Sequence, residues 1–373
     1  MFVCYMGELK KTPLYDEHVK LGAKIVEFGG WSMPVYYSTL IDEHLTTRAK
    51  AGLFDICHMG EFFIEGNGAF KLIQGVITND LSKLSDGGAF YSCICLENGG
   101  VADDLFVYRF NSEKFMIVVN AGNIDKDFRI FSGPKDGLDV AVVDKSNQTA
   151  KLDVQGPNAQ EILQKLTEVD LSSLERFCFV EGKVNCVDTI ISRTGYTAED
   201  GFELYFDASR AVEMWNKILE VGSEFGLKPV GLGARDTLRI EACYSLYGHE
   251  LTEEINPLEA GVGFVVKLDK DNFVGKEALL KIKEDGLKRK IVAFELIERG
   301  IPREHYEVYK NNEKIGYVTS GTMSPTFKTG LGMAFVNPEE ASVDNEIDVK
   351  IRDKFYKAKI VERPIYTFNK KIP

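Results

Sequence analysis

The sequence predicts an α+β protein of more than one domain, followed by a C-terminal domain built of β-strands. The chain has 373 residues, more than one hydrophobic core usually serves. Helical and strand-like segments alternate irregularly over the first three quarters of the chain, which favours α+β over a doubly wound sheet. Beyond the highly charged stretch 281–290, short alternating runs are split by turn residues. That pattern is typical of a small all-β barrel or jelly roll.

The individual elements follow from hydrophobic spacing and cap residues. A short helix is expected over 16–22 and a longer one over 38–51, with Gly52 as its C-cap. A strand is expected over 61–65, and Asn123 is expected to cap a helix. The helix capped by Asn123 is expected to end near 131, and further helices are expected to end near 166 and to span 208–222 and 235–242. Further strands are expected at 89–96, 101–108, 150–155, 183–193, 201–207, 291–296, 307–309, 313–319, 332–336, 346–351 and 356–361.

Composition excludes several classes of function. A formal charge of −12 argues against binding to nucleic acid or to an anionic membrane. There is no apolar run long enough to span a bilayer, and residues 1–5 are too short and too poorly charged for a targeting peptide. Met6 is an alternative start. The 7 cysteines lack a Cys-x-x-Cys pair and the 5 histidines lack His-x-x-x-His spacing. We therefore expect a cytoplasmic protein with reduced thiols and no metal site.

Adjacent aspartates, Asp103 and Asp104, interrupt an apolar strand-like run, and neighbours in a strand point to opposite faces. A buried carboxylate needs a donor, a cation or a ligand. Asn98-Gly99 just before the run predicts a two-residue type I′ hairpin turn. In that register Cys93 pairs with Asp104.

The same register pairs Tyr91 with Phe106. Tyr91, Asp104 and Tyr108 are then expected on one face, and Asp103 on the other. A carboxylate between two tyrosines suits a flat polar heterocycle that is stacked and hydrogen-bonded. The alternative is a structural carboxylate that bonds only backbone amides or an arginine.

A second carboxylate, Glu203, sits inside the strand-like segment 201–205 between apolar neighbours. Gly231-Leu232-Gly233-Ala234 leads to Arg235, which is expected at a helix start, on the unfavourable side of the helix dipole. Arg235 therefore needs a partner, either a ligand anion or a carboxylate such as Glu203. The two glycines are equally consistent with simple turns, and neither a Rossmann fingerprint nor a P-loop is present.

Five segments, in order along the chain, resemble the aminomethyltransferase (T-protein) family of the glycine cleavage system. The resemblance runs from Lys11-Thr12-Pro13-Leu14-Tyr15 to Arg363-Pro364-Ile365-Tyr366. The segments that carry it are Phe-Asp-Ile-Cys-His-Met-Gly at 54–60, Asn-Gly-Gly-Val-Ala-Asp-Asp at 98–104, Ser-Arg-Thr-Gly-Tyr-Thr at 192–197, Gly-Leu-Gly-Ala-Arg-Asp-Thr-Leu-Arg-Ile-Glu-Ala at 231–242, and Thr-Ser-Gly-Thr-Met-Ser-Pro-Thr at 319–326.

The resemblance implies a three-domain cloverleaf around a central opening where tetrahydrofolate sits. It implies a discontinuous α+β folate-binding domain at 1–50 plus 147–280, an inserted α+β domain with an antiparallel meander at 51–146, and a C-terminal β-barrel domain at 288–373. Such proteins take the aminomethyl group on the lipoyl arm of H-protein. They release ammonia, 5,10-methylenetetrahydrofolate and dihydrolipoyl H-protein.

Matching the motifs implies roles for single residues. Asp104 falls on the catalytic aspartate, Glu203 on the pterin-binding glutamate and Arg235 on the folate-contacting arginine. The residues that match the rest of the pocket are Tyr91, Tyr108, Asn120, Tyr196 and Tyr244.

The chain departs from the family pattern at three places. Ala198 replaces a usual glycine, which demands a negative φ or some strain. Cys57 replaces a usual serine. Only Lys370 and Lys371 stand where the family tail often has arginines near the folate's glutamate tail.

Two alternative functions exist on the same fold. One is a folate-dependent demethylase, which differs at 54–60, where this chain resembles T-protein. The other is a non-enzymatic folate-binding protein of iron–sulfur assembly. That group carries a cysteine motif that is absent at 271–277, and in such a protein Asp104 would be dispensable.

Overall fold

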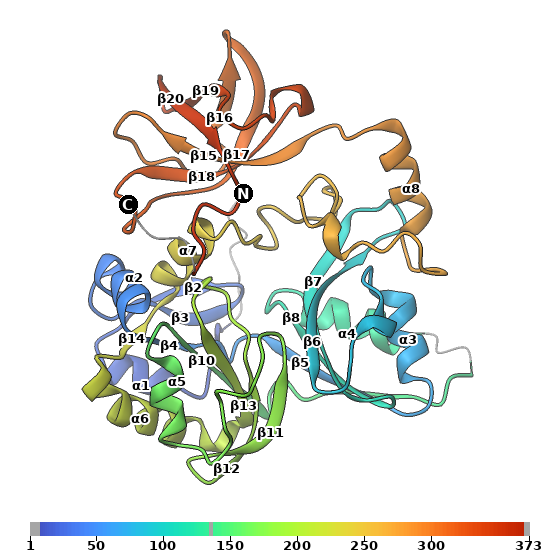
Figure 1. The fold of residues 1–373 in the computed structure, drawn as a ribbon, viewed down its shortest axis with the longest axis vertical. Coiled ribbons are helices and arrows are strands. Elements are labelled where there is room, and N and C mark those ends of the chain that lie inside the picture. The colour runs from blue at the N-terminus through green and yellow to red at the C-terminus, as the bar shows by residue number, and fades with distance from the viewer. Residues whose placement is uncertain (1–7, 134–136, 369–373) are drawn as a thin grey trace. The chain divides into compact units, whose positions relative to one another are not determined.

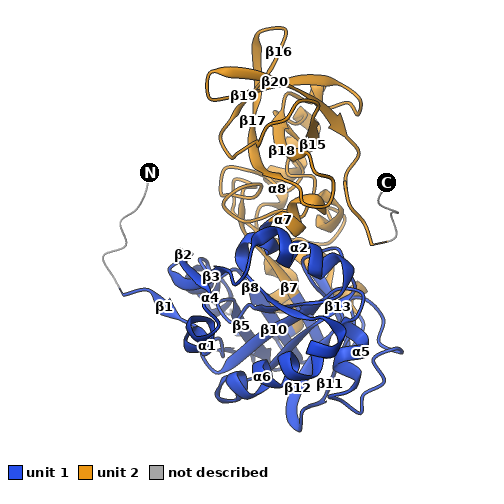
Figure 2. Ribbon diagram, turned by 90° about the vertical axis from the view of Figure 1, so that its left-hand side faces the viewer, with its two compact units in different colours: residues 1–69, 85–90, 107–236 blue, residues 70–84, 91–106, 237–373 orange. Residues whose placement is uncertain are grey.

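The computed structural model describes residues 8–133 and 137–368, and the chain divides into two compact units (Figure 2). Unit 1 takes residues 1–69, 85–90 and 107–236, and unit 2 takes 70–84, 91–106 and 237–373. The α+β class predicted from the sequence is confirmed. The division into three domains stays a prediction. Met1, Cys4, Met6, Lys370 and Lys371 lie outside the described residues.

Unit 1 is built on a mixed six-stranded sheet (Figure 1). One face of its strand β10 carries Ala150, Leu152 and Val154, which pack with helices α5 and α6 in a hydrophobic core. The strand order is β11 (Phe179–Val184), β12 (Val187–Ser192), β13 (Gly201–Asp207), β10 (Thr149–Gln155), β4 (Gly52–Asp55) and β14 (Lys228–Val230). The helices are α5 (Ala159–Gln164) and α6 (Ala211–Gly222), the latter preceded by a 3-10 turn at Ala208–Arg210 and followed by another at Ser223–Phe225.

Two details of this region differ from the prediction. The expected strand at 183–193 is a hairpin, because Asn185 and Cys186 adopt positive φ angles of 48° and 61° between β11 and β12. Helix α2 begins after Thr39, whose side chain accepts a hydrogen bond from the Asp42 backbone. It ends at Ala49, and Gly52 starts β4 rather than capping the helix. A small sheet of order β1-β3-β2 and helix α1 complete the N-terminal part: β1 (Lys10–Lys11), α1 (Tyr15–Lys20), β2 (Lys24–Phe28), β3 (Trp31–Tyr36) and α2 (Leu40–Ala49).

A further five-stranded sheet has the order β6-β7-β8-β5-β9. Residues 88–90 of β6 and 107–111 of β7 are counted in unit 1, and the remaining residues of both strands in unit 2. The bounds are β5 (Gly60–Glu65), β6 (Gly88–Cys95), β7 (Val101–Asn111), β8 (Lys114–Val119) and β9 (Ala141–Asp144), with helices α3 (Ala69–Val76) and α4 (Ile124–Ser132) and a 3-10 turn at Leu81–Lys83.

The turn between β6 and β7 corrects the sequence prediction. Leu96 N–H donates to the Gly100 carbonyl at 2.8 Å, and Gly99 N–H donates to the Leu96 carbonyl at 2.9 Å. The loop therefore has three residues, and only Gly99 takes a positive φ, of 85°. A slip of one residue moves every side chain of a strand to the other face. The predicted pairing of Cys93 with Asp104 and of Tyr91 with Phe106 therefore rests on a turn that the structure does not have.

The C-terminal part of unit 2 is a closed barrel, which confirms the predicted all-β domain (Figure 1). Its interior is apolar and includes Phe294, Val308, Val318 and Val349. The barrel order is β15 (Lys290–Leu296), β18 (Gly330–Val336), β17 (Glu313–Met323), β16 (Glu307–Lys310), β19 (Glu346–Ile351) and β20 (Lys354–Val361). The helices that precede the barrel are α7 (Leu232–Glu241) and α8 (Lys276–Asp285), with a 3-10 turn at Gly263–Val265 between them. A further 3-10 turn, Pro338–Glu340, lies between β18 and β19.

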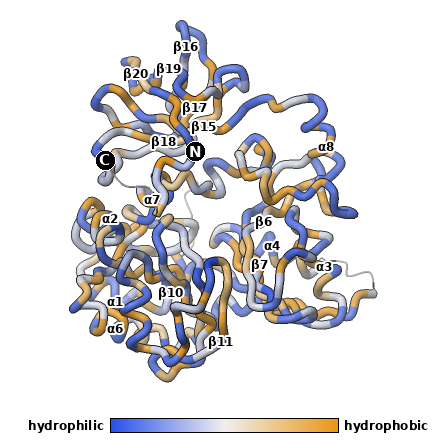
Figure 3. Tube along the Cα trace, viewed as in Figure 1, coloured by the Kyte–Doolittle hydropathy of each residue, from blue (hydrophilic) through white to orange (hydrophobic). Residues whose placement is uncertain are grey.

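Hydrophobic and hydrophilic residues alternate along most elements, as Figure 3 shows. This is the pattern of elements that bury one face. Within the described ranges, no helix is both long and apolar enough to cross a membrane.

Candidate active site

The polar face of β10 supplies the first group of buried charges, in unit 1. Lys151, Asp153 and Gln155 alternate with the core residues, and all three are buried. The strand register sets Asp153 directly opposite Glu203 on β13, and Lys151 opposite Tyr205. Directly opposite residues share a face, so two carboxylates and an ammonium meet on one side of the sheet.

Glu203 is held by partners on both carboxylate oxygens. The Lys151 ammonium lies 2.9 Å from Oε1. The Thr194 hydroxyl donates to Oε2 at 2.5 Å, and the Tyr108 and Tyr205 hydroxyls each donate to Oε2 at 3.3 Å. The carboxylate thus has hydrogen-bond donors around it and remains slightly exposed, at 7%.

These contacts set the ionisation of the two facing carboxylates. Burial pushes the pKa of Glu203 upward, but the Lys151 ammonium and the Thr194 hydrogen bond outweigh burial and hold it below its usual value. Burial and the charge of Glu203 raise the pKa of Asp153 to about 7, against the opposing effect of Arg235 and Lys151. Glu203 is therefore the ionised member of the pair at neutral pH.

Arg235, which is only partly buried, belongs to the same group. Its guanidinium lies 3.2 Å from Oδ2 of Asp153 and 4.8 Å from the centroid of the Tyr196 ring. Two expectations need correction. Arg235 lies at the fourth position of α7, which already begins at Leu232, and its carboxylate partner is Asp153, not Glu203. Oδ1 of Asp153 is buried and accepts no hydrogen bond within the described part of the chain.

Two further titratable side chains, His58 and Glu61, are buried in unit 1. Burial, together with the charges of Arg235 and Lys151, lowers the pKa of His58 to about 4, so its ring is neutral at physiological pH. Burial raises the pKa of Glu61 well above its usual value. Burial likewise raises the pKa of the Cys57 thiol, which makes Cys57 an unreactive packing residue.

The loop that carries Thr194 and Tyr196 is strained at Ala198, where φ is 63°. Of the two alternatives for this replacement of glycine, strain is the one observed. Arg48 fixes the loop by donating to the Thr197 carbonyl at 2.6 Å and pairing with Glu199 at 2.8 Å. The loop shape is thus enforced by a buried ion pair.

Asp104 lies in a different setting, in unit 2. It is half-buried, whereas Asp103 is fully buried, so the two point to opposite faces as predicted. The Tyr91 hydroxyl donates to Oδ2 of Asp104 at 2.9 Å. The ring centroids of Tyr91 and Phe106 lie 5.8 Å apart. The predicted shared face of Tyr91 and Asp104 is therefore confirmed, although the turn used to derive it is wrong.

Tyr91 also stacks on Phe264, with ring centroids 6.5 Å apart and planes at 27°. Phe264 is 67% exposed, an unusual position for a large apolar side chain. The carboxylate of Asp104 thus has an aromatic, solvent-accessible neighbourhood. This is suitable for a ligand that stacks.

The two remaining predicted residues, Asn120 and Tyr244, each take part in a backbone hydrogen bond just after an element ends. Asn120 follows β8 in unit 1, and its carbonyl accepts from the Asn123 N–H at 2.9 Å. Tyr244 follows α7 in unit 2, with its N–H donating to the Arg239 carbonyl at 2.9 Å. Arg239 is itself buried and paired with Glu250 at 3.0 Å.

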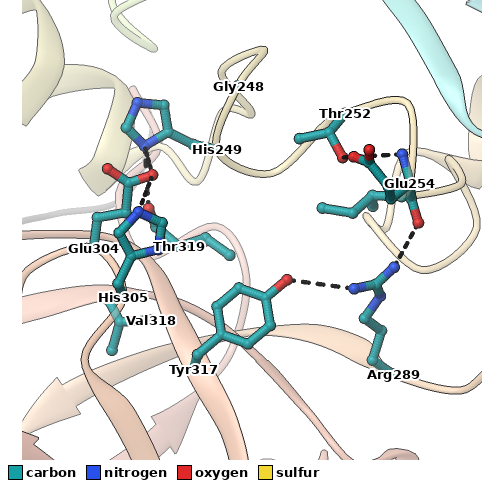
Figure 4. Close-up of a pocket in the computed structure, with 11 residues that line it drawn as sticks. Gly248, His249, Thr252, Glu254, Arg289, Glu304, His305, Tyr317, Val318 and Thr319 are labelled. Carbon is teal, nitrogen blue, oxygen red and sulfur yellow. Dashed lines mark hydrogen bonds and ion pairs between the residues drawn. The ribbon is translucent and has the colours of Figure 1, made fainter. Parts of the chain in front are cut away.

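A cavity of about 220 Å³ in unit 2 contains none of the predicted site residues (Figure 4). His249 and His305 lie 3.2 and 3.6 Å from the Glu304 carboxylate on one side. On the other side, Arg289 donates to the Glu254 carbonyl at 2.6 Å and to the Tyr317 hydroxyl at 3.4 Å. The cavity's two histidines thus lie against one carboxylate, and Arg289 also pairs with Glu259 at 2.9 Å.

Sequence reasoning missed four residues of the Glu203 group: Lys151, Asp153, Thr194 and Tyr205. A signal was present for the first two. In Ala-Lys-Leu-Asp-Val-Gln at 150–155, charged residues alternate with apolar ones inside a strand, as around Asp103 and Asp104. Thr194 lies within the segment 192–197 that was singled out, but its contact with Glu203 depends on the pairing of β12 and β13.

Comparison with known proteins agrees with this architecture. The family model described as the GCVT N-terminal domain matches residues 14–270. The model described as the glycine cleavage T-protein C-terminal barrel domain matches residues 289–367, which contain the closed barrel.

Full-length relatives extend the match. The chain is 53% identical to an aminomethyltransferase of Thermoanaerobacter pseudethanolicus over 367 residues, covering 98% of this chain and 100% of the relative. It is 49% identical to that of Halalkalibacterium halodurans over 363 residues, covering 97% and 99%. The crystal structure of the glycine cleavage system aminomethyltransferase T from Bartonella henselae superposes with a TM-score of 0.90 at 32% identity, covering 96% of this chain and 98% of that one.

The fold and the two family matches define a protein of the glycine cleavage T-protein class. The chain belongs to the aminomethyltransferase family, and it is an enzyme, a transferase of the glycine cleavage system.

Proposed function

We propose that this transferase moves the methylene carbon from the S-aminomethyldihydrolipoyl arm of H-protein to tetrahydrofolate. Ammonia, 5,10-methylenetetrahydrofolate and dihydrolipoyl H-protein are the products, and the reaction takes place in the cytoplasm. Family membership over almost the whole chain supports the reaction. We further propose that residues 1–50 plus 147–280, 51–146 and 288–373 act as the three domains of this enzyme.

The observation that carries the folate assignment is the placement of the Glu203 carboxylate, with the Lys151 ammonium at Oε1 and three hydroxyl donors at Oε2. A pterin presents its N3–H and 2-amino group as a pair of donors, and an ionised carboxylate accepts both. Glu203 meets this requirement because Lys151 at 2.9 Å holds its pKa down despite burial. The Arg235 guanidinium lies 4.8 Å from the centroid of the Tyr196 ring. These two side chains would offer a cation and a stacking ring to the same cofactor.

Asp104 is proposed as the catalytic carboxylate. N5 of the folate bonds to the methylene carbon as ammonia leaves with one of the folate's protons. The C–S bond then breaks and the dihydrolipoyl thiol takes the second proton, while positive iminium character develops at the carbon until N10 closes the ring. A half-buried carboxylate stabilises that charge and can take or relay a proton. The Tyr91 hydroxyl, 2.9 Å from Oδ2, fixes the orientation of the carboxylate. Tyr108, Asn120 and Tyr244 are proposed to complete the folate pocket.

The experiment that tests this function is tetrahydrofolate-dependent ammonia release from aminomethylated H-protein. The wild-type chain is expected to release ammonia only when tetrahydrofolate is present, with 5,10-methylenetetrahydrofolate formed in equal amount. Ammonia release without folate, or folate binding without turnover, would contradict the proposal. Turnover of a small methylated substrate in place of H-protein would favour the demethylase.

A further inference from the structure

Strand β10 carries two buried titratable side chains, Lys151 and Asp153, that have no direct part in the proposed reaction. The side chains of Lys151 and Asp153 are 3% and 0% exposed. They lie on one face of the strand, and the residues between them, Leu152 and Val154, enter the hydrophobic core on the other face. Neither Lys151 nor Asp153 is therefore accessible enough to contact a substrate.

Lys151 and Asp153 are each paired with one side chain that is proposed to contact the folate. Lys151 lies 2.9 Å from Glu203, and Asp153 lies 3.2 Å from Arg235. The partners are more exposed, with side-chain accessibilities of 9% for Glu203 and 14% for Arg235. Lys151 and Asp153 thus lie beneath two side chains that are slightly more exposed than they are.

This arrangement is unfavourable for the free energy of folding. Burying ion pairs usually gains nothing over well-packed apolar side chains. Asp153 and Glu203 also face one another directly across two strands, where like charges repel. The three buried titratable side chains on this sheet face, with the partly buried Arg235 beside them, therefore require a role other than stability.

We propose that Lys151 and Asp153 are positioning residues for the folate site: Lys151 holds Glu203 as an ionised acceptor, and Asp153 holds the Arg235 guanidinium over the Tyr196 ring. This inference rests on the proposed function, because it assigns a task to Lys151 and Asp153 only if Glu203 and Arg235 contact the folate.

The surroundings of Glu203 explain why Lys151 is needed. From β10 it faces Lys151 and Asp153, and from its own strand Tyr205. The other groups that act on it are the hydroxyls of Thr194 and Tyr108, the more distant guanidinium of Arg235 and the buried carboxyl of Glu61. Lys151 is the one cation in direct contact with Glu203 among the described residues. Without Lys151, burial and the facing Asp153 favour the protonated form of Glu203.

The test measures tetrahydrofolate affinity against pH for Lys151→Met and for the conservative variant Lys151→Arg. In Lys151→Met, affinity is expected to fall as pH decreases through the neutral range, by up to about tenfold per pH unit below the raised pKa of Glu203. Lys151→Arg is expected to restore the shallower pH dependence of the wild type. If Lys151→Met does not fold, Lys151→Gln, which keeps a polar group in the cavity, serves as the second variant.

A matched control removes a buried histidine–carboxylate hydrogen bond from the opposite face of the same sheet. His18 lies 2.8 Å from Asp55, which the register pairs with Leu152 and so places on the core face. His18→Gln is expected to lower the melting temperature without changing the pH profile of folate affinity. An equal change of profile in His18→Gln and Lys151→Met would reduce Lys151 to a structural role and overturn the inference.

Asp153→Asn provides the second arm. Arg235 then loses its carboxylate, so the Michaelis constant for tetrahydrofolate is expected to rise severalfold while kcat at saturating folate is retained. An unchanged Michaelis constant would overturn the role of Asp153.

Glu203→Gln distinguishes a failure of this inference from a failure of the proposed function. If it weakens folate binding while Lys151→Met keeps wild-type affinity at every pH, the inference fails and the proposed function stands. If Glu203→Gln binds folate as the wild type does, the proposed pterin contact fails and the inference fails with it.

Discussion

Glu203 and Asp104 share one sequence pattern, a carboxylate inside an apolar strand, but their surroundings differ. Glu203 is enclosed by an ammonium and three hydroxyls on its two oxygens. Asp104 is half-buried beside one tyrosine and an aromatic neighbourhood that includes the exposed Phe264. The same pattern therefore gives a carboxylate of fixed charge in one place and an accessible one in the other.

The difference indicates a division of labour. A carboxylate whose charge and orientation are fixed by the protein suits recognition, since binding requires no reorganisation. A carboxylate with room beside it suits proton transfer and charge stabilisation at a reacting carbon. Variants of the Asp104 and Glu203 carboxylates and of their surroundings test that contrast.

The largest effect is expected from Asp104→Asn. The change is nearly isosteric, but it removes the charge that stabilises the iminium-like transition state and accepts a proton. The turnover number is expected to fall by about 10²–10⁴-fold with a smaller change in folate affinity. Single-turnover ammonia release, combined with calorimetric folate titration, measures both quantities.

Asp103→Asn is the matched control for Asp104→Asn. Asp103 is fully buried on the other face of β7, so its substitution is expected to act mainly on stability. A selective loss of turnover in Asp103→Asn would show that the face assignment is wrong by one residue. Near wild-type ammonia release by Asp104→Asn would remove Asp104 from the chemistry.

Glu203→Gln should weaken tetrahydrofolate binding by about 1–3 kcal/mol, because the amide presents a donor to a donor edge. Loss of affinity without an equal loss of kcat would sharpen the contrast with Asp104. Isothermal titration measures the affinity. A variant that lost turnover while binding folate normally would assign Glu203 to chemistry instead.

Asp153→Asn tests the electrostatics beneath the site through pH. The folded-state pKa of Asp153, about 7, lies above its ordinary value of 3.8, so between these two values the folded chain binds a proton that the unfolded chain has lost. This group therefore makes wild-type stability fall as pH rises through that window. The stability of Asp153→Asn relative to wild type should rise there, by up to about 1.4 kcal/mol per pH unit.

Urea unfolding at a series of pH values measures the Asp153→Asn difference. The lost contact with Arg235 shifts the whole curve and does not change its slope. A constant difference between variant and wild type from about pH 4 to about pH 7 would show that Asp153 is already ionised in the folded chain.

The smallest effect is expected from Ala198→Gly. Ala198 adopts a φ of 63°, in a region that costs a non-glycine residue about 1–2 kcal/mol. The greater entropy of glycine in the unfolded chain offsets part of that gain. A net stabilisation of roughly 0.5 kcal/mol is expected, seen as a small rise in melting temperature.

Ala49→Gly in α2 is the control, because Ala49 is exposed and helical. There the same substitution should destabilise, by up to about 0.5 kcal/mol because Ala49 is the last residue of the helix. If both variants shifted stability in the same direction, the strain at Ala198 would not be real.

Local signals predicted much of the fold. The C-terminal strands were found within a few residues because each is a short alternating run bounded by turn residues, and alternation does not depend on what packs against it. β10 and β13 were found for the same reason. The sequence could not indicate that 183–193 is two strands, since the turn there uses Asn185 and Cys186 with no glycine or proline.

Asp104, Glu203 and Arg235 stood out because a charge in an apolar strand, or at a helix start, requires a partner. The identity of the partner was not predictable. Arg235 pairs with Asp153, 82 residues away along the chain. The Asn98-Gly99 turn was misassigned because the same dipeptide fits both a two-residue and a three-residue loop.

The sequence by itself therefore determined the α+β class, the C-terminal all-β domain, the family and the faces of Asp103 and Asp104, because these depend on local periodicity and motif order. Only the tertiary structure decided that Lys151 lies beneath Glu203, that Asp153 faces it with its pKa raised, and that Ala198 is held in a left-handed conformation. Each of these depends on strand pairing and burial between distant segments. The charge state of a buried group is set by those neighbours and not by its own position in the chain.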